Sequence, residues 1–288
     1  MRVVLCLFLL LVSSPVLADE PTVAFEPREG ALVGWTWTQS ESWVSKGHSV
    51  VKLGPVKIRN RKLDKHVTFS CGVEVQEVVQ VLPSQVALRC WEANAVDHGE
   101  AEELPVTGLD VQGLGVGSER KFETADGDRL KKSLREFFER RFRDRDPDVK
   151  EPLGFLLPEG PVTAGDSWTM DLQAIQDWFG PDRFTMDRTQ SHGRVALREV
   201  VERDGDLYGR LDFSTAIVPA TIRDGEFQEA RMLLEGSALL PLRGDLPYME
   251  LDLDMDIRFL GKVKRKGIGV HLDIDTRVRG WEKKQPAT

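Results

Sequence analysis

The sequence feature that most constrains the fold is a strict alternation of apolar and charged residues near the end of the chain. From Met249 to Phe259 every odd position is apolar, and every even position is Glu, Asp or Arg. The run Ile268–Val278 alternates as well, and Gly261–Gly267 lies between the two runs. Because successive residues of a strand point to opposite faces, each run has one apolar face and one wet face. The pattern predicts an antiparallel hairpin in a sheet that is buried on one side.

Alternating runs separated by turn residues recur along the chain. Asp204-Gly205 and Asp224-Gly225 each lie between two such runs, and Asp-Gly is typical of a tight hairpin turn. In the first half, two runs that meet at Pro83-Ser84 predict another hairpin. A strand is also predicted at Ala31–Val44, where three Trp share one face, and a weaker one at Val50–Ile58. The predicted pairs of strands are His66–Leu82 with Gln85–Val96, Val195–Glu202 with Leu207–Ile217, and Ala220–Ile222 with Phe227–Leu240.

One segment, Asp128–Asp146, has helical rather than strand periodicity, with apolar residues on one face. They are Leu130, Leu134, Phe137, Phe138 and Phe142. Asp126 or Asp128 is predicted to cap the helix, and Pro147 ends the pattern. The other face is basic, which fits either a solvated face of a helix that covers a sheet, or a contact with anionic lipid or a partner. Its cations are Lys131, Lys132, Arg135, Arg140, Arg141, Arg143 and Arg145.

The predicted fold is mainly β: an antiparallel, hairpin-rich curved sheet, half-barrel or sandwich-like, with one amphipathic α-helix covering it. A connection dense in Pro and Gly follows the helix, and after it Thr169–Leu172 is predicted as a strand and Leu172–Phe179 as a single helical turn. Gly99–Gly117 is predicted as a Gly-rich loop that holds at most one short strand. The predicted regions are 1–18 (signal peptide), 19–127 (N-terminal β region), 128–146 (amphipathic helix), 147–168 (Pro/Gly connection) and 169–288 (C-terminal β region).

The first residues, MRVVLCLFLLLVSSPVLA, are typical of a secretory signal peptide that ends at Ala18. The apolar run Val3–Val12 is shorter than the roughly 20 residues that a membrane anchor needs. No later stretch is long and apolar enough to span a bilayer. We therefore expect an exported protein, periplasmic or extracellular, that is not membrane-spanning and is a monomer or weakly associating. The formal charge of −8 argues against nucleic acid as a partner, since nucleic acid is bound by Lys and Arg.

Cys71 and Cys90 are the only cysteines beyond the predicted signal peptide. A pair of cysteines in an oxidising compartment predicts a disulfide. A turn at Pro83-Ser84 would place Cys71 opposite Val96, however, and not opposite Cys90. The bond therefore requires a bulge, for which Gly72 is a candidate, or a different strand pairing. Two buried free thiols are the alternative.

A short motif in the connection resembles known proteins. Leu157-Pro158, Val162, Gly165-Asp166 and Trp168 form the pattern L-P-x-x-x-V-x-x-G-D-x-W. It is similar to a motif of bacterial exported β-rich families that are known only as domains of unknown function. The resemblance implies an envelope or secreted protein in which hairpins follow the motif and the Trp packs under the sheet, and it implies no catalytic residue. The overall plan is also similar to periplasmic lipoprotein-carrier folds, which is a likeness of architecture alone.

No catalytic residue, resident metal or cofactor is predicted, and no ligand-binding residue can be assigned. The chain has no G-x-S-x-G elbow, and Gly113, Gly115 and Gly117 are not followed by the G-K-S/T of a nucleotide loop. The histidines have no metal-ligand spacing from one another or from a Cys. They are His48, His66, His98, His192 and His271.

Acidic residues gather on the polar face of the C-terminal hairpin. They are Asp252, Asp254 and Asp256 on one strand, and Asp273 and Asp275 on the next. If the strands pair across Gly261–Gly267, several carboxylates face each other, which is unfavourable. A bound Ca²⁺ would relieve the repulsion. Arg258, Arg277 and Arg279, or the basic helix face, would also relieve it, and a hydrated face with screened charges is the third possibility.

Three functions fit these observations. The first is a non-catalytic envelope protein that holds an apolar ligand or a protein partner on its sheet, suggested by the long apolar face of Val195–Val278. A fully packed core without a cavity is the alternative interpretation of the same face. The second is a structural or assembly factor that docks a partner through the basic helix face. The third, an enzyme of a type without these motifs, is the least expected.

Overall fold

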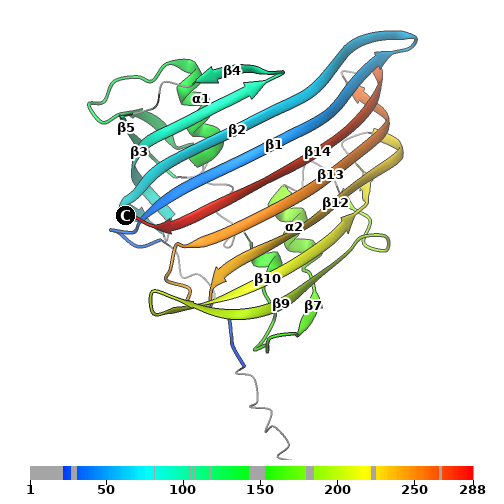
Figure 1. The fold of residues 1–288 in the computed structure, drawn as a ribbon. Helices are drawn as coiled ribbons and strands as arrows, with labels where there is room; N and C mark the ends of the chain where they lie inside the picture. Colours follow the sequence, from blue (N-terminus) through cyan, green and yellow to red (C-terminus); the bar gives the residue numbers. More distant parts are fainter. Residues whose placement is uncertain are drawn as a thin grey trace, which may run out of the picture.

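The fold is described by a computed structural model (Figure 1). The residues it describes are 22–26, 31–80, 82–103, 106, 108–116, 119–142, 153–179, 185–221, 225–265 and 268–287. Within these ranges, twelve strands form one antiparallel sheet, which confirms the predicted mainly β class. The sheet is open, because its end strands, β6 and β7, do not pair with each other.

The sheet runs in the order β6-β5-β3-β2-β1-β14-β13-β12-β10-β9-β7, with β4 added beside β3, and β8 and β11 form a separate ribbon. The strands are β1 (Thr36–Leu53), β2 (Val56–Val79), β3 (Leu82–Asp97), β4 (Glu100–Glu103), β5 (Leu109–Leu114), β6 (Lys121–Thr124), β7 (Ser167–Thr169), β8 (Thr185–Met186), β9 (His192–Arg203), β10 (Asp206–Ile217), β11 (Pro219–Thr221), β12 (Gly225–Pro241), β13 (Met249–Arg265) and β14 (Ile268–Pro286). The helices are α1 (Lys132–Phe142), η2 (Gly154–Leu156, a 3-10 turn) and α2 (Leu172–Phe179).

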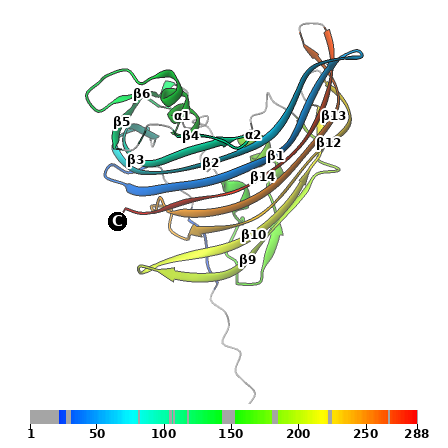
Figure 2. The ribbon, with the colours of Figure 1, turned by 45° about the horizontal axis from the view of Figure 1, so that its top comes forward.

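The first and last long strands pair with each other in the middle of the sheet. β1 lies beside β14 from Trp37, opposite Pro286, to Lys52, opposite His271. This pairing joins the two predicted β regions into one continuous, strongly curved sheet (Figure 2). Each β region therefore contributes one strand to the central pair of the sheet.

Both helices pack on the same face of the sheet, which we call the inner face. Directly paired residues point to the same face, so a row of side chains can be followed from strand to strand. One row across the inner face is Phe69, Glu41, Glu282, Leu251, Ala238, Leu211 and Leu197. It is apolar at both ends and acidic on β1 and β14.

The inner face therefore carries two separate cores. The first core lies between α1 and strands β2, β3, β5 and β6, and includes Phe69 and Phe138. The second core lies between α2, η2 and strands β9, β10, β12 and β13, and includes Ile175 and Leu211. All five apolar residues of the predicted helical stripe are buried in the first core, so this part of the helix prediction is confirmed.

Helix α1 begins later than predicted, at Lys132. Asp128 does not cap it, because Asp128 closes a turn with Thr124 instead. The Thr124 amide donates to the Asp128 carbonyl at 2.9 Å, and the Asp128 amide donates to Thr124 Oγ1 at 2.9 Å. Asp126 lies in the same turn. The predicted C-terminal end at Asp146 lies outside the described residues.

Several predicted strand boundaries were wrong. The predicted strand at Val50–Ile58 is the end of β1, a turn at Gly54-Pro55 and the start of β2. The predicted loop Gly99–Gly117 contains both β4 and β5. The β13–β14 hairpin continues through Gly261 to Arg265, and α2 is longer than a single turn.

The hairpin predicted at Asp224-Gly225 was also wrong. β11 pairs with β8, while β12 pairs with β10 and β13. The hairpin at Asp204-Gly205 is confirmed, and both turn residues have the positive φ, 54° and 87°, that a tight two-residue turn requires.

Candidate functional site

A cluster of polar side chains lies on the inner face between the two cores, and we call it the polar island. Its members are Trp37, Gln39, Glu41 and Trp43 on β1, and Glu282 and Lys284 on β14. Gln39 and Glu41 are each only 5% exposed. Buried polar groups are costly unless they are hydrogen-bonded, so the contacts within the island decide whether it is stable.

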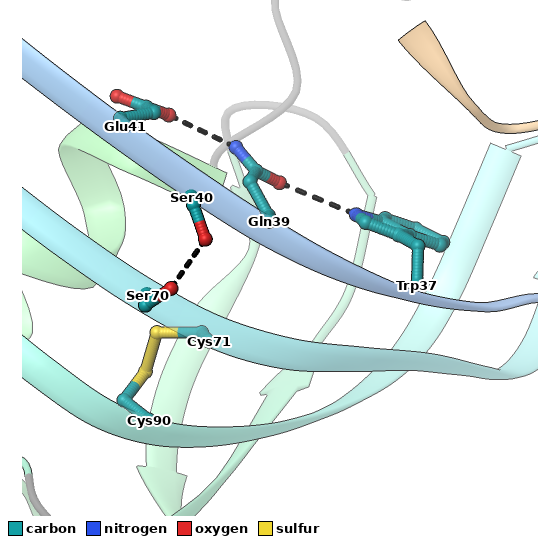
Figure 3. The surroundings of a disulfide bond; sticks show 7 residues. All are labelled: Trp37, Gln39, Ser40, Glu41, Ser70, Cys71 and Cys90. Carbon is teal, nitrogen blue, oxygen red and sulfur yellow. Dashed lines mark hydrogen bonds between the residues drawn. A yellow bond between two sulfur atoms is a disulfide. The ribbon is translucent and has the colours of Figure 1, made fainter. Parts of the chain in front are cut away.

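The island is internally hydrogen-bonded. Gln39 Nε2 donates to Glu41 Oε1 at 2.9 Å, and Trp37 Nε1 donates to Gln39 Oε1 at 3.4 Å (Figure 3). Gln39 Nε2 also donates to Glu282 Oε1 at 3.2 Å, and Trp43 Nε1 donates to Glu41 Oε2 at 2.9 Å. The sequence contained a signal for this cluster, since Gln39 and Glu41 share their strand face with the three Trp. That face was interpreted as aromatic only.

Beyond the second core, the inner face continues toward the far ends of the long strands as an apolar surface that is only half-buried. We call it the distal patch, and it consists of Val51, Phe227, Ile257, Phe259, Leu272 and Ile274. Cross-strand pairing makes the patch contiguous. Ile274 lies opposite Phe259, and Leu272 lies opposite Val51. The rings of Phe227 and Phe259 meet edge to face with centroids 6.0 Å apart.

Two glycines of the inner face are covered by aromatic rings. Gly280 on β14 is paired with Trp43, and Gly236 on β12 is paired with Phe213. Both glycines are paired with Leu253, which lies between them on β13. A Cβ at Gly280 would overlap the Trp43 ring, and a Cβ at Gly236 would come within 2.7 Å of the Phe213 ring. The rings therefore occupy the space that side chains would otherwise fill.

Behind these glycines, the outer face has a shallow hollow of about 590 Å³. Its lining includes Asp254, Arg279 and Trp281. Gly236 and Gly280 are themselves part of its lining. No group that could hold a metal, made of three or more His, Cys, Asp or Glu side chains, occurs in the described part of the chain.

The acidic constellation of the C-terminal hairpin lies on this outer face, and arginines neutralise it. The register places Asp254 opposite Arg279, Asp256 opposite Arg277 and Arg258 opposite Asp275. The other two carboxylates lie opposite apolar side chains, Asp252 opposite Trp281 and Asp273 opposite Leu260. No two carboxylates therefore face each other between β13 and β14. Of the three explanations offered by the sequence, the arginines are the one that the register supports.

The ion pairs lower the pKa of the carboxyl groups that take part in them. Arg277 donates to both oxygens of Asp254, at 2.9 and 2.6 Å, and this hydrogen bonding, with Arg279 at 2.7 Å, lowers the pKa of Asp254. Burial raises the pKa of Asp273, but the hydrogen bond from Arg258 at 2.7 Å and its charge outweigh burial, so the net pKa is lowered. Both carboxylates are held in the charged form.

The predicted disulfide between Cys71 and Cys90 is present, and both residues are buried in the first core (Figure 3). The strand pairing differs from the prediction in two ways. The β2–β3 turn lies at Gln80, which has φ 48°, and not at Pro83-Ser84. The bulge is at Trp91 and not at Gly72, because Ser70 lies opposite Glu92 while Cys71 lies opposite Cys90. The earlier turn places the two cysteines directly opposite each other, and the bulge at Trp91 lies beyond them, farther from the turn.

The basic face of the helix is only partly described. Lys132 pairs with Glu136 at 3.9 Å, and Arg135 pairs with Glu139 at 3.8 Å. Of the other predicted cations, Lys131 is exposed. The side chains of Arg140 and Arg141, and all of Arg143 and Arg145, lie outside the described residues. Lys132 and Arg135 thus make i,i+4 pairs within the helix, as is common on a solvated face.

The histidines are dispersed over the sheet. His48 lies 3.6 Å from Asp273, His98 lies 3.4 Å from Asp97, and His66 shares a hydrogen bond of 3.0 Å with Ser42.

No helix in the described ranges combines the length and the apolar character needed to cross a bilayer.

The motif around Trp168 fastens the connection to the edge of the sheet. Trp168 Nε1 donates to the Leu156 carbonyl at 3.1 Å, and the ring packs against the second core. Gly165 has φ 91°, and Asp166 accepts a hydrogen bond from the Thr163 amide at 2.8 Å. Backbone hydrogen bonds of Gly165 and Asp166 with Leu197 then attach this turn to β9. The motif therefore has a structural role here.

Comparisons with known proteins give no family for this chain. No protein-family model matches it, and no curated protein matches it either. Among solved structures, it is similar to one described as "Lipid-protein interactions in lipovitellin", with a TM-score of 0.30 and 6% sequence identity. The match covers 89% of this chain and 26% of that chain, so this chain spans about a quarter of the length of its counterpart. The suspected motif family stays a prediction.

Proposed function

We propose that this is an exported, non-catalytic protein that binds an apolar ligand, such as a lipid acyl chain, on the distal patch of its inner face. The observation that carries the proposal is the half-buried state of Val51, Phe227, Ile257, Phe259, Leu272 and Ile274. These side chains continue the apolar face beyond the second core but are not buried to the same degree. A contiguous apolar surface of this kind on a water-soluble protein is typical of a binding site.

The position of the polar island is consistent with a ligand that is apolar over most of its length, because it bounds the apolar surface on which such a ligand would lie. It interrupts the inner face on β1 and β14, so the distal patch and the second core are continuous with each other but not with the first core. An apolar ligand on the distal patch would extend along β13 toward Met255 and Leu253, which are also half-buried. The disulfide supports export, because disulfides persist mainly outside the cytoplasm.

A matched pair of variants tests the proposal. Phe259→Ser removes the central ring of the distal patch, whereas Leu233→Ser removes a 38% exposed apolar side chain from the outer face of β12, opposite Asp256. We expect a naphthylamine-type apolar fluorophore to bind the unaltered protein and the Leu233→Ser variant alike. Binding to Phe259→Ser should be at least about tenfold weaker, because a buried aromatic contact is worth roughly 1.5–3 kcal/mol.

Extraction of the protein from its native envelope provides the second test. Mass spectrometry of the extract should identify a bound lipid or other apolar molecule, and an acyl-chain competitor should displace the fluorophore. A protein that is recovered without any apolar molecule, and that binds the fluorophore equally well with Ser at position 259, would contradict the proposal. Thermal melts of both variants establish that each is folded at the assay temperature.

A further inference from the structure

The turn between β1 and β2 is strongly basic, although the chain as a whole is acidic. Five of the eleven residues in Lys52–Lys62 are Lys or Arg, and none is Asp or Glu, while the whole chain has a formal charge of −8. We call Lys52–Lys62 the basic tip. Its cations are Lys52, Lys57, Arg59, Arg61 and Lys62. The tip lies at one end of the sheet, beside the turn end of β13 and β14 (Figure 1).

Two cations of the tip lie opposite each other, and basic residues of β14 and β13 continue the row. Lys57 lies opposite Lys52, Lys52 lies opposite His271, and His271 lies opposite Lys262. Like charges in directly opposed positions destabilise a sheet. Farther along the same outer face, by contrast, Asp254 and Asp256 each lie opposite an Arg of β14. The register that neutralises the middle of the hairpin leaves a row of basic residues at its end.

Large apolar side chains are exposed between these cations. Leu53, Val56 and Ile58 are 42%, 63% and 58% exposed. Leu53 lies opposite Val56, so the two side chains project from the same face of the turn. The other edge of β2 is also open here, because β3 pairs with β2 only as far as Lys65. The end of this strand pair thus combines exposed apolar side chains with neighbouring cations. Such a combination is complementary to a surface that has an apolar layer beneath a layer of negative charge.

We propose that the basic tip docks on the surface of an anionic phospholipid bilayer. Leu53, Val56 and Ile58 enter the interfacial layer, and the row of cations faces the phosphate groups. The anionic headgroups relieve the repulsion within the row. Because the rest of the chain is acidic, the same surface repels the body of the protein, so the sheet stands on the membrane by its tip. The proposal does not depend on a ligand in the distal patch.

Vesicle binding by two matched double variants tests this docking. Lys52→Gln with Lys57→Gln removes two charges from the row, and Lys121→Gln with Lys131→Gln removes two exposed charges from the region of β6 and α1. The unaltered protein should co-sediment with vesicles of phosphatidylglycerol and phosphatidylcholine, and not with phosphatidylcholine alone. The tip variant should bind at least about tenfold more weakly, since each cation near an anionic surface contributes roughly a factor of five. The control should bind less than twofold more weakly.

Stability and salt provide readouts that a purely structural role would not give. The tip variant should melt at the same temperature as the unaltered protein or higher, because it loses like-charge repulsion while it loses membrane binding. Added salt should weaken vesicle binding. Val56→Ser with Ile58→Ser should reduce binding further at high salt, where the apolar contribution remains.

Three results would overturn the proposal. One is no binding of the unaltered protein to phosphatidylglycerol vesicles, and another is equal loss of binding in both double variants. The third is association of the tip variant into larger species together with undiminished vesicle binding, which would mean that the cations only protect an open strand edge. Phe259→Ser should still bind vesicles, so failure of the ligand proposal and failure of the docking proposal are distinguishable.

Discussion

At the scale of single residues, the outer face of the β13–β14 hairpin shows how register determines the role of a charge. Asp254 receives two hydrogen bonds from Arg277 and one from Arg279, although its side chain is 32% exposed. The alternation in the sequence indicated that these side chains share a wet face. It did not show which ones are opposite, because a shift of one residue in register changes every partner.

The acid dependence of stability follows from this site. The folded-state pKa of Asp254 lies below its ordinary value of 3.8. A lowered folded-state pKa stabilises the protein fully above the ordinary value, and this contribution is lost as the pH falls through the folded-state pKa. Replacement of Arg277 by Gln should raise the folded-state pKa of Asp254. The variant should therefore lose less stability between about pH 4 and pH 2 than the unaltered protein.

Urea unfolding at a series of pH values measures this difference. Arg194→Gln is the matched control, because Arg194 donates to the hydroxyl of Ser167 at 2.6 Å and the donated bond involves no carboxylate. Its acid profile should follow that of the unaltered protein. Identical acid profiles for the two variants would show that the Asp254 ion pairs do not contribute to acid sensitivity.

At the scale of elements, the sequence predicts those turns and buried faces that depend only on neighbouring residues. The β9–β10 turn was found from Asp204-Gly205, and the buried face of α1 was found from its apolar spacing. The β2–β3 turn was placed three residues too late, because Pro83-Ser84 is a better turn signal than Gln80 and the residue after it. A bulge such as that at Trp91 has no pattern in the sequence, since it depends on packing against the neighbouring strand.

The disulfide links β2 to β3, so the stability of this strand pair depends on a single covalent bond. Replacing both Cys71 and Cys90 by Ala should lower the free energy of unfolding by roughly 3 kcal/mol, because the bond closes a loop with a sequence separation of 19. Urea unfolding measures the loss. Reductant should destabilise the unaltered protein by a similar amount and leave the double variant unchanged. A reductant effect on the double variant would locate the sensitivity elsewhere.

At the scale of the whole molecule, the sheet is completed by contacts between the two ends of the chain. β1 pairs with β14, so the two cores are parts of one sheet and not of two domains with a linker. Hairpin patterns could not predict this pairing, because its partners are separated by more of the chain than any local signal spans. The contact between Glu282 and Gln39 in the polar island could not be predicted for the same reason, since the two residues meet only when the ends pair.

Removal of the last strand segment should therefore affect both halves. Deleting residues 281–288 removes the β14 partners of Trp37 to Ser42 and exposes a strand edge on β1. We expect the melting temperature, followed by the circular dichroism of the strands, to fall by at least about 10 °C, since several kcal/mol of paired backbone is lost. Deleting only residues 287–288, which follow β14, should have no effect. Equal melting temperatures for the two deletions would mean that the halves are stable independently.

The two ring-covered glycines, Gly236 and Gly280, have a consequence for how this shape can change. At both positions a methyl group would collide with a ring and with the backbone of the adjacent strand, whose nearest atoms are the Asp252 and Ser42 carbonyl oxygens. An alanine could be accommodated only if the neighbouring strands move apart, which would flatten the bend between β1 and β10. The curvature of the sheet at these positions thus depends on the absence of two side chains. Exchanging either glycine for a larger residue therefore offers a way to change the curvature of the sheet without altering a residue of the two cores or of the distal patch.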